Sequence, residues 1–276
     1  MAATSPIHFD VEHLREAVLR TYDRVARDPR GDFHFHRGAR YASEYLGYDP
    51  AELAELPESC TARFAGVGNP LQIGTVIAAV PGMRRENAGP CPGETVLDHA
   101  CGAGMDLLLA ARRVGPRGRA IGVDMTPAMR ACAQASAELA GLSDRVQIRA
   151  GYMESLPVDD GSVDLVISNG VVNLAPDKTR VFREIARVLR PGGRLFLADV
   201  VVQRELTLDA RENPDLWAAC VAGAMVESEI PTLASEAGLV DGRVVQRFDC
   251  FRDTPAEARV AKDLFIQGVN FYARRA

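Results

Sequence analysis

The sequence predicts an α/β protein built on a mostly parallel sheet and preceded by a helical cap. Short apolar runs alternate with segments of helical spacing between about residues 95 and 201. This alternation is typical of a parallel sheet with helices on its faces. One of these runs, Thr95–Asp98, passes through a turn of small residues directly into an apolar helical pattern. We therefore expect ligands at the carboxyl ends of the strands.

The first segment, residues 1–90, is predicted to form the helical cap and a linker. Leu14, Val18 and Tyr22 recur at helical spacing, and no strand alternation interrupts this part of the chain. Helices are expected over 11–27, 39–46 and 71–80, with a short one that begins at the capping residue Asp49.

The second segment, residues 91–205, is predicted to be the Rossmann-like core. Strands are expected over 95–98, 120–124, 146–150, 163–168 and 194–201, and the helices between them over 105–113, 127–141 and 177–189. Pro127 suits the first position of its helix, and Gly192 and Gly193 end the last one.

The third segment, residues 206–276, is predicted to complete the sheet. Helices are expected over 216–225 and 231–237, and two final strands over 243–250 and 265–273, joined by a helix near 255–262. The last strand is a candidate antiparallel edge.

The composition favours a protein that acts on small molecules. A net charge of -5 argues against a polyanionic partner such as nucleic acid. No apolar run reaches the length of a membrane span, and the first ten residues lack the pattern of a secretory signal. The six scattered cysteines suggest reduced thiols and a cytoplasmic location. The oligomeric state is left open by the sequence.

The turn after the first predicted strand indicates a nucleoside cofactor. Asp98 ends the strand, glycines at 102 and 104 let the backbone approach a ligand, and Asp124 ends the next strand. An acid at this spacing can hold the hydroxyls of a ribose. Leu107 stands where a dinucleotide fold needs its third glycine, and carboxylates would repel a diphosphate. S-adenosylmethionine, a cationic sulfonium, therefore fits this turn better than a dinucleotide.

Two further patterns bear on ligands. Met153 and Glu154 follow the third predicted strand, where an apolar side chain and an acid can frame a purine. His34 and His36 could chelate a metal from one strand face, or alternate with buried phenylalanines as ordinary polar positions. Because no third ligand is near, no metal site is predicted.

Several motifs in order resemble those of the class I S-adenosylmethionine methyltransferases, and more narrowly of the arsenite methyltransferase branch. They are Asp98-His-Ala-Cys-Gly-Ala-Gly104, Ile121-Gly-Val-Asp-Met-Thr126, Ser168-Asn-Gly-Val-Val-Asn-Leu174, Asp177-Lys and Arg187-Val-Leu-Arg-Pro-Gly-Gly-Arg194. The resemblance covers about residues 60–240. It implies a seven-stranded sheet with an antiparallel last strand, and S-adenosylmethionine as the cofactor.

The resemblance also implies which residues surround the cofactor. They are Asp98, Ala100, Cys101, Gly102, Asp124, Met125, Met129, Met153, Glu154 and Asn169. By this resemblance, the first four residues lie in the turn and surround the methionine part of the cofactor, and Asp124 binds the ribose. The three methionines and Glu154 lie around the adenine. Asn169 closes the pocket. Ala100 stands where the family has a glycine, and its methyl group is acceptable if the local φ is negative.

The substrate positions depart from the family pattern. Arsenite enzymes hold trivalent arsenic with cysteine thiolates, but this chain has Val67 and Gly170 where two of them are expected. Cys220 stands at the third position, and Cys60 and Cys250 are the other candidates to join it.

The sequence therefore predicts a methyltransferase of a small-molecule acceptor other than arsenite. The alternatives are an arsenite methyltransferase using Cys220 with non-standard cysteines, a non-catalytic cofactor-binding module, and an NAD-dependent oxidoreductase. Asn173 and Cys220 are the candidate catalytic residues, and no general base is assigned.

Overall fold

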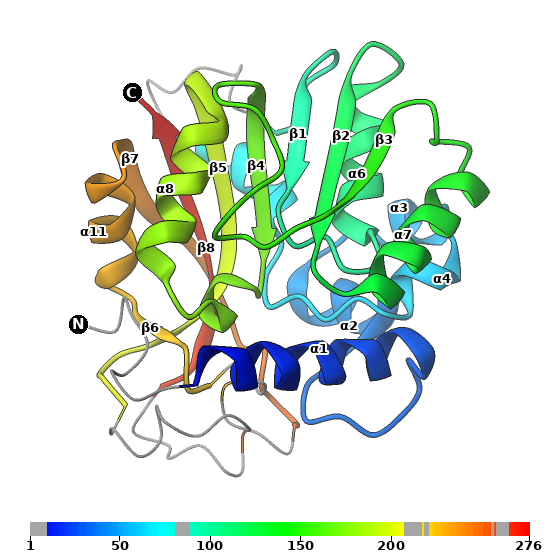
Figure 1. The fold of residues 1–276 in the computed structure, drawn as a ribbon, viewed down its shortest axis with the longest axis horizontal. Helices are drawn as coiled ribbons and strands as arrows, with labels where there is room; N and C mark the ends of the chain where they lie inside the picture. The colour runs from blue at the N-terminus through cyan, green and yellow to red at the C-terminus, as the bar shows by residue number, and fades with distance from the viewer. Residues whose placement is uncertain (1–9, 81–88, 207–216, 218–220, 255–256, 258–264) are drawn as a thin grey trace.

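The computed structural model describes residues 10–80, 89–206, 217, 221–254, 257 and 265–276. Its centre is one sheet with the strand order β3-β2-β1-β4-β5-β8-β7, and the two-residue strand β6 pairs with β5 outside this order (Figure 1). The sheet is parallel except at β8, which runs antiparallel to both of its neighbours. The predicted α/β class, the sheet of about seven strands and the antiparallel last strand are confirmed.

The strands and helices have the following bounds. The strands are β1 (Thr95–Asp98), β2 (Arg119–Asp124), β3 (Val146–Ala150), β4 (Val163–Asn169), β5 (Leu189–Val202), β6 (Met225–Val226), β7 (Leu239–Phe248) and β8 (Gln267–Arg275). The helices are α1 (Val11–Arg27), α2 (Gly38–Leu46), α3 (Pro50–Ala54), α4 (Glu58–Thr61), η1 (Pro70–Gln72), α5 (Ile73–Ala78), α6 (Met105–Val114), α7 (Pro127–Leu139), η3 (Val172–Leu174), α8 (Lys178–Val188) and α11 (Glu229–Glu236).

Two apolar layers fill the faces of the sheet. Alternate residues of one strand, such as Val96 and Leu97, belong to different core clusters because their side chains point to opposite faces. One cluster contains the apolar sides of α8 and α11, which lie in front of the sheet in Figure 1, and the other contains those of α1, α6 and α7. The central strands are therefore buried on both faces, which explains their near-continuous apolar sequences.

Helix α1 crosses the carboxyl ends of the parallel strands (Figure 1). The Asp10 side chain caps its first turn by accepting hydrogen bonds from the backbone N–H groups of Glu12 and His13, both at 3.0 Å. Its apolar side, including Leu14 and Val18, is buried. The predicted helical character of the first third of the chain is confirmed for residues 10–80.

The position of the last strand corrects one prediction. β8 is not at the edge of the sheet; it lies between β5 and β7. Val269, Phe271 and Ala273 are fully buried in it, whereas β7 contains two register shifts and Asp241 at a positive φ of 60°. The short alternating patterns of the two strands did not reveal which would be enclosed.

The predicted helix over 216–225 is wrong over residues 221–225, whereas Trp217, the other described residue of this range, is helical. Val221–Ala224 is a turn closed by a hydrogen bond from the Ala224 N–H to the Val221 carbonyl, and Met225 pairs with Val201 in the sheet. Gly223 permits this path, because a Cβ there would lie 1.8 Å from the Asn173 carbonyl oxygen. Most of the helix expected near 255–262 lies outside the described residues.

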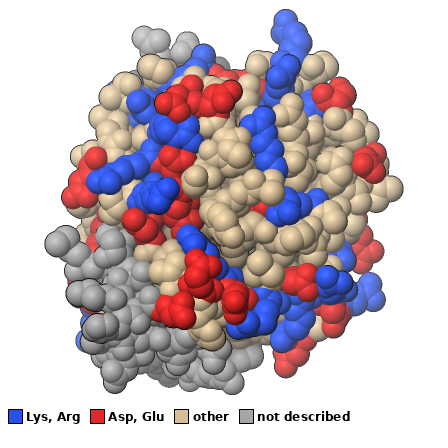
Figure 2. Space-filling model, in the orientation of Figure 1, with Lys and Arg blue, Asp and Glu red and all other residues tan. Residues whose placement is uncertain are grey.

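Two properties bear on possible partners. None of the described helices is long and apolar enough to cross a membrane. Basic and acidic side chains are interspersed on the face shown in Figure 2.

Candidate functional site

A cavity opens between α1 and the carboxyl ends of the strands, and its empty space of about 1070 Å³ includes solvent at its open mouth. Its walls come from four parts of the chain: α1, residues 60–66, the ends of β1 to β3 with the turns that follow them, and the segment from Asn169 to Pro176. The sequence predicts a ligand site at this edge of the sheet.

The turn between β1 and α6 forms the floor of the cavity. Gly102 and Gly104 have φ values of 52° and 93°, which favour glycine, and a Cβ at Gly102 would meet open space. Ala100 is not among the residues with positive φ, so its methyl group is tolerated as expected. Leu107 is fully buried against Gly122 of β2, and it occupies the place where a dinucleotide fold needs a glycine.

Asp124 ties this turn to the end of β2. One of its carboxylate oxygens accepts the N–H of Gly102 at 2.9 Å, and the other accepts the N–H of Thr126 at 2.8 Å. Burial raises the pKa of Asp124, although these two hydrogen bonds oppose the shift. The carboxylate is therefore held rigidly at the cavity wall.

Asp98 and Asp106 add two more buried carboxyl groups to the same wall. Burial raises the pKa of Asp98 well above its ordinary value, and the nearby Asp106 and Asp124 raise it further. Burial also raises the pKa of Asp106, against hydrogen bonds from Tyr48 and Asn169 that favour its charged form. A cluster of this kind suits a cationic ligand, which would relieve the repulsion among the carboxylates.

Three methionines and Glu154 are among the residues that line the cavity. Met129 of α7 is buried, and Met125 and Met153 are partly buried. The Glu154 carboxylate lies 3.7 Å from the guanidinium of Arg15 on α1, and 8% of its side chain is exposed. An apolar surface with one acid beside it can receive a purine.

Asn169 lines the cavity, but its side chain is occupied by the protein. Its Oδ1 accepts the N–H groups of Val67 and Gly68 at 2.8 and 3.4 Å. Its Nδ2 donates to Asp106 at 2.9 Å and to the Tyr48 hydroxyl at 3.1 Å, and Tyr48 donates to Asp106 at 2.6 Å. Asn169 thus holds the 66–70 loop in place, and its role in closing the pocket around a cofactor stays a prediction.

Of the two catalytic candidates, the structure describes Asn173 but not Cys220. Asn173 is fully buried, donates from Nδ2 to Asp199 at 2.8 Å, and is absent from the cavity lining. Asp199 also accepts the N–H groups of Val172 and Asn173, so it fixes η3, whose Leu174 lines the cavity. Cys220 lies outside the described residues.

Four polar aromatic residues of the cap, His34, His36, Tyr41 and Tyr45, are also absent from the described lining. The His36 ring stacks on Tyr41 at a centroid distance of 4.9 Å, and its Nε2 lies 2.6 Å from the Arg252 carbonyl. The Tyr41 hydroxyl donates to the carbonyl of Gly66, which is part of the cavity wall. Among the described residues no group of three or more metal-binding side chains occurs.

Two thiols, Cys60 and Cys101, line the cavity. Burial raises the pKa of Cys60 to about 12 and that of Cys101 well above its ordinary value, so both are protonated near neutral pH. Val67 and Gly170 are neighbours: a Cβ on Gly170 would lie 3.4 Å from a Val67 methyl group. The two positions at which the resemblance expects cysteines therefore meet in space and carry no sulfur.

Three contributors to the site are not predicted from the sequence: Arg15, Tyr48 and Asp199. Arg15 could have been suspected, because it shares a helix face with Leu14 and Val18. Tyr48 and Asp199 act through partners 58 and 26 residues away, and no local pattern marks such pairs.

The fold and this cavity define a nucleoside-cofactor-binding α/β protein whose site favours a cationic group over a diphosphate. Residues 91–238 match the family model described as a methyltransferase domain, and the chain belongs to that family.

Individual relatives agree with this assignment. The chain is 43% identical over 196 residues to an arsenite methyltransferase of Halobacterium salinarum, covering 71% of this chain and 46% of the relative. It is 40% identical over 158 residues to one from Aquipseudomonas alcaligenes, covering 55% and 45%. The chain thus spans about half the length of these curated relatives.

Among solved structures, an arsenic(III) S-adenosylmethionine methyltransferase from Chlamydomonas reinhardtii is similar, with a TM-score of 0.61 and 32% identity over 81% of this chain and 71% of that one. A further relative found by its sequence, a nocamycin O-methyltransferase from Saccharothrix syringae, is 41% identical over 113 residues, covering 41% of this chain and 40% of the relative. The predicted family, with S-adenosylmethionine as its cofactor, is confirmed.

Proposed function

We propose that this chain transfers a methyl group from S-adenosylmethionine to a small, largely apolar acceptor other than arsenite. The observation that carries the proposal is the division of the cavity wall. Buried carboxyl groups line it at the strand ends, and apolar side chains line it on α1 and around η3.

The residues present fit the cofactor. Asp98 and Asp124 are acids whose charged forms burial disfavours, so a bound ammonium and sulfonium would stabilise them. The open space over Gly102 leaves room for a ligand against the backbone. In this proposal Asp124 holds the ribose, Asp98, Ala100, Cys101 and Gly102 surround the methionine part, and Met125, Met129, Met153 and Glu154 hold the adenine.

The cofactor supplies an electrophilic methyl group, and the chain supplies alignment and exclusion of water. Leu14 and Val18 of α1 are buried over the cavity and keep solvent from it. Asn169 contributes indirectly, since it fixes the 66–70 loop beside the acceptor.

The acceptor side favours an apolar molecule that needs no base from the protein. Phe64, Val171 and Leu174 line it. His99 is the imidazole among the described lining residues; burial lowers its pKa to about 4, and its Nε2 is 2.8 Å from the Ser168 hydroxyl. A group with this pKa is a poor base at neutral pH.

Arsenite is disfavoured because soft thiolate ligands are lacking at the described positions. Val67 and Gly170 carry no sulfur, and the thiols of Cys60 and Cys101 are protonated.

The cysteines also bear on the cellular compartment. The free thiols of Cys60, Cys101 and Cys132 support a reducing compartment such as the cytoplasm.

Calorimetry with S-adenosylhomocysteine tests the cofactor assignment. We expect the wild type to bind with micromolar affinity or better, and Asp124→Ala to lose measurable binding because both the ribose contact and the support of Gly102 disappear. Asp144→Ala, an exposed acid paired with Arg145, is the matched control and should bind normally. A wild type that produces no heat would end the proposal.

Incubation with a labelled methyl donor and fractionated cell extract tests the acceptor. We expect label in a small apolar metabolite. Methylated arsenic from the wild type but not from Cys220→Ser would instead establish the arsenite reaction. Tight cofactor binding with no labelled product would favour a non-catalytic module, and fluorescence quenching by NADH would favour the oxidoreductase.

A further inference from the structure

The two ends of α1 are attached to the rest of the molecule in different ways. Near its C-terminal end, the Ala26 carbonyl accepts a hydrogen bond from Arg63 Nε at 2.7 Å and a contact from the Cys132 thiol at 4.0 Å. Nearer its N-terminal end, Leu14 and Arg15 face the cavity. Contacts made by this part of the helix therefore bear directly on access to the cavity.

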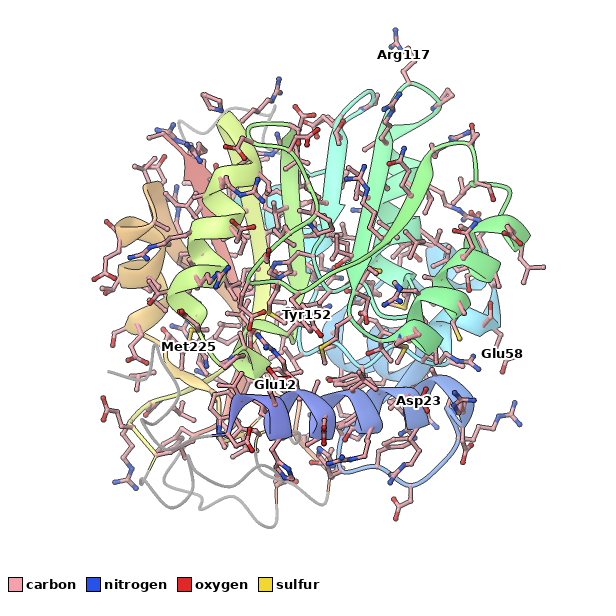
Figure 3. The ribbon with its side chains drawn as sticks, viewed as in Figure 1. Glu12, Asp23, Glu58, Arg117, Tyr152 and Met225 are labelled. Atoms are coloured by element: carbon pink, nitrogen blue, oxygen red, sulfur yellow. The ribbon has the colours of Figure 1, made fainter. Side chains whose placement is uncertain are left out.

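Arg15 makes the polar contact between this part of α1 and the loop after β3. Its guanidinium lies 3.7 Å from the Glu154 carboxylate and 4.9 Å from the centroid of the Tyr152 ring. A second carboxylate, that of Glu12, holds the same guanidinium at 2.9 Å. In Figure 3, Tyr152 lies beside the end of α1 that carries Glu12.

The two partners of Arg15 in this loop differ in exposure, so the contact spans the rim of the cavity. Glu154 is buried, whereas 46% of Tyr152 is exposed. A buried carboxylate without a positive partner is unfavourable, and the same cavity already contains Asp98, Asp106 and Asp124. Arg15 offsets this negative charge from across the rim.

We propose that Arg15 is a positioning residue that fastens α1 across the adenine end of the cavity and sets how fast the cofactor product leaves. The inference rests on the proposed function, because it takes Glu154 as an adenine contact. Arg15 holds Glu154 in place through charge and holds α1 over the loop through its stack on Tyr152. Departure of the product requires both contacts to separate.

Three substitutions separate the two contacts. Arg15→Gln removes both of them, and we expect S-adenosylhomocysteine to dissociate about tenfold faster, since a partly buried ion pair and a cation–π contact are lost together. Arg15→Lys keeps the charge but loses the planar stack, and Tyr152→Leu removes the stack alone. Each of these should accelerate dissociation about threefold.

The control is Arg20→Gln on the same helix. Arg20 is exposed and pairs with Glu16 at 3.3 Å, so the substitution makes the same change in charge away from the cavity. Its dissociation rate should equal that of the wild type. Added salt should accelerate dissociation from the wild type and from Arg15→Lys, but not from Arg15→Gln, because screening acts on the ion pair.

Stopped-flow dissociation of S-adenosylhomocysteine from the full chain measures these rates. Equal rates for the wild type, Arg15→Gln and Tyr152→Leu would overturn this inference and leave the proposed function intact. Failure of the wild type to bind would instead overturn the proposed function. If Arg15→Gln does not fold, Tyr152→Leu at the exposed rim still decides, and a wild-type rate for it would reject the inference.

Discussion

The two sides of the cavity are built in opposite ways. The cofactor side comes from strand ends and one continuous turn, and its carboxyl groups are fixed by backbone N–H groups such as that of Gly102. The acceptor side is assembled from α1, residues 60–66 and the segment around η3, and it is mostly apolar. In the proposed division, the ends of the strands hold the cofactor, the segments added to the sheet surround the acceptor, and α1 also reaches the cofactor side through Arg15.

The two sides also differ in their relation to stability. Burial opposes the charged forms of Asp98, Asp106 and Asp124, so the cofactor side is unfavourable until a cation binds. On the acceptor side, Leu14, Phe64 and Leu174 are buried apolar groups that contribute to the core. Substitutions on the two sides should separate binding from folding.

Among the substitutions that compare the two sides of the cavity, Asp98→Asn should have the largest effect. Loss of a charge-assisted contact to a ligand cation should weaken S-adenosylhomocysteine binding about tenfold to a hundredfold. The free energy of unfolding should stay equal or rise, because a buried charge is replaced by a neutral group of the same shape. Calorimetry and urea unfolding measure the two quantities, and a loss of both binding and stability would contradict the distinction.

Leu174→Ala should do the reverse. Truncating this buried side chain should lower the free energy of unfolding by about 2 kcal/mol, the lower end of the usual range, because the site borders a cavity. S-adenosylhomocysteine affinity should change by less than about threefold, since Leu174 is on the acceptor side. Cofactor binding weakened as much as in Asp98→Asn would break the comparison.

The affinity for S-adenosylhomocysteine should depend on pH through the same acids. Below the raised pKa of Asp98 the free protein holds this carboxyl protonated, and the ligand ammonium favours the ionised form. Affinity should therefore rise, by at most about tenfold per pH unit for one group, as pH rises through that pKa, and then level off. The part of the pH dependence that comes from Asp98 should be lost in Asp98→Asn, while Asp106 and Asp124 retain theirs, as calorimetry across a pH series would measure.

The stability of the free protein should have the opposite pH dependence. Burial raises the pKa of Asp199 from 3.8 to about 6, so the folded state binds a proton that the unfolded state has lost. The contribution of Asp199 to stability is therefore greatest below pH 3.8 and falls as pH rises to about 6. Urea unfolding at pH 4.5 and 7 should show a larger decrease in the wild type than in Asp199→Asn.

The smallest effect is expected for Tyr41→Phe. Its hydroxyl donates at 3.0 Å to the carbonyl of Gly66 at the acceptor wall. Loss of this bond should lower the unfolding free energy by about 1 kcal/mol and leave cofactor affinity unchanged. A change in affinity greater than the change in stability would show that the cap also shapes the cofactor side.

Much of the cofactor side could be predicted because its signals are local. β1 and β3 have the expected bounds, and the turn from Asp98 to Gly104 combines an acid, glycines and a helix start within seven residues. Local backbone rules sufficed even at Ala100, whose φ is not positive. All the residues expected near the cofactor, from Asp98 to Asn169, line one cavity.

The acceptor side could not be predicted to the same depth, because it depends on contacts between distant segments. The pairing of Tyr48 with Asp106 joins residues 58 positions apart. Asn173 is a catalytic candidate by sequence, yet its side chain in η3 donates to Asp199 of β5 and is buried in the core. The order of β7 and β8 was missed for a similar reason, since alternation along a strand says nothing of its neighbours.

The enclosed position of β8 has a consequence for biosynthesis. Among the described strands, β7 is hydrogen-bonded to β8 alone, and β8 lies later in the chain. While the polypeptide grows on the ribosome, residues 239–248 therefore have to wait without a pairing partner until residues 267–275 have emerged. The charged side chains of Asp241 and Arg247 in this segment would discourage association with other nascent chains during this interval.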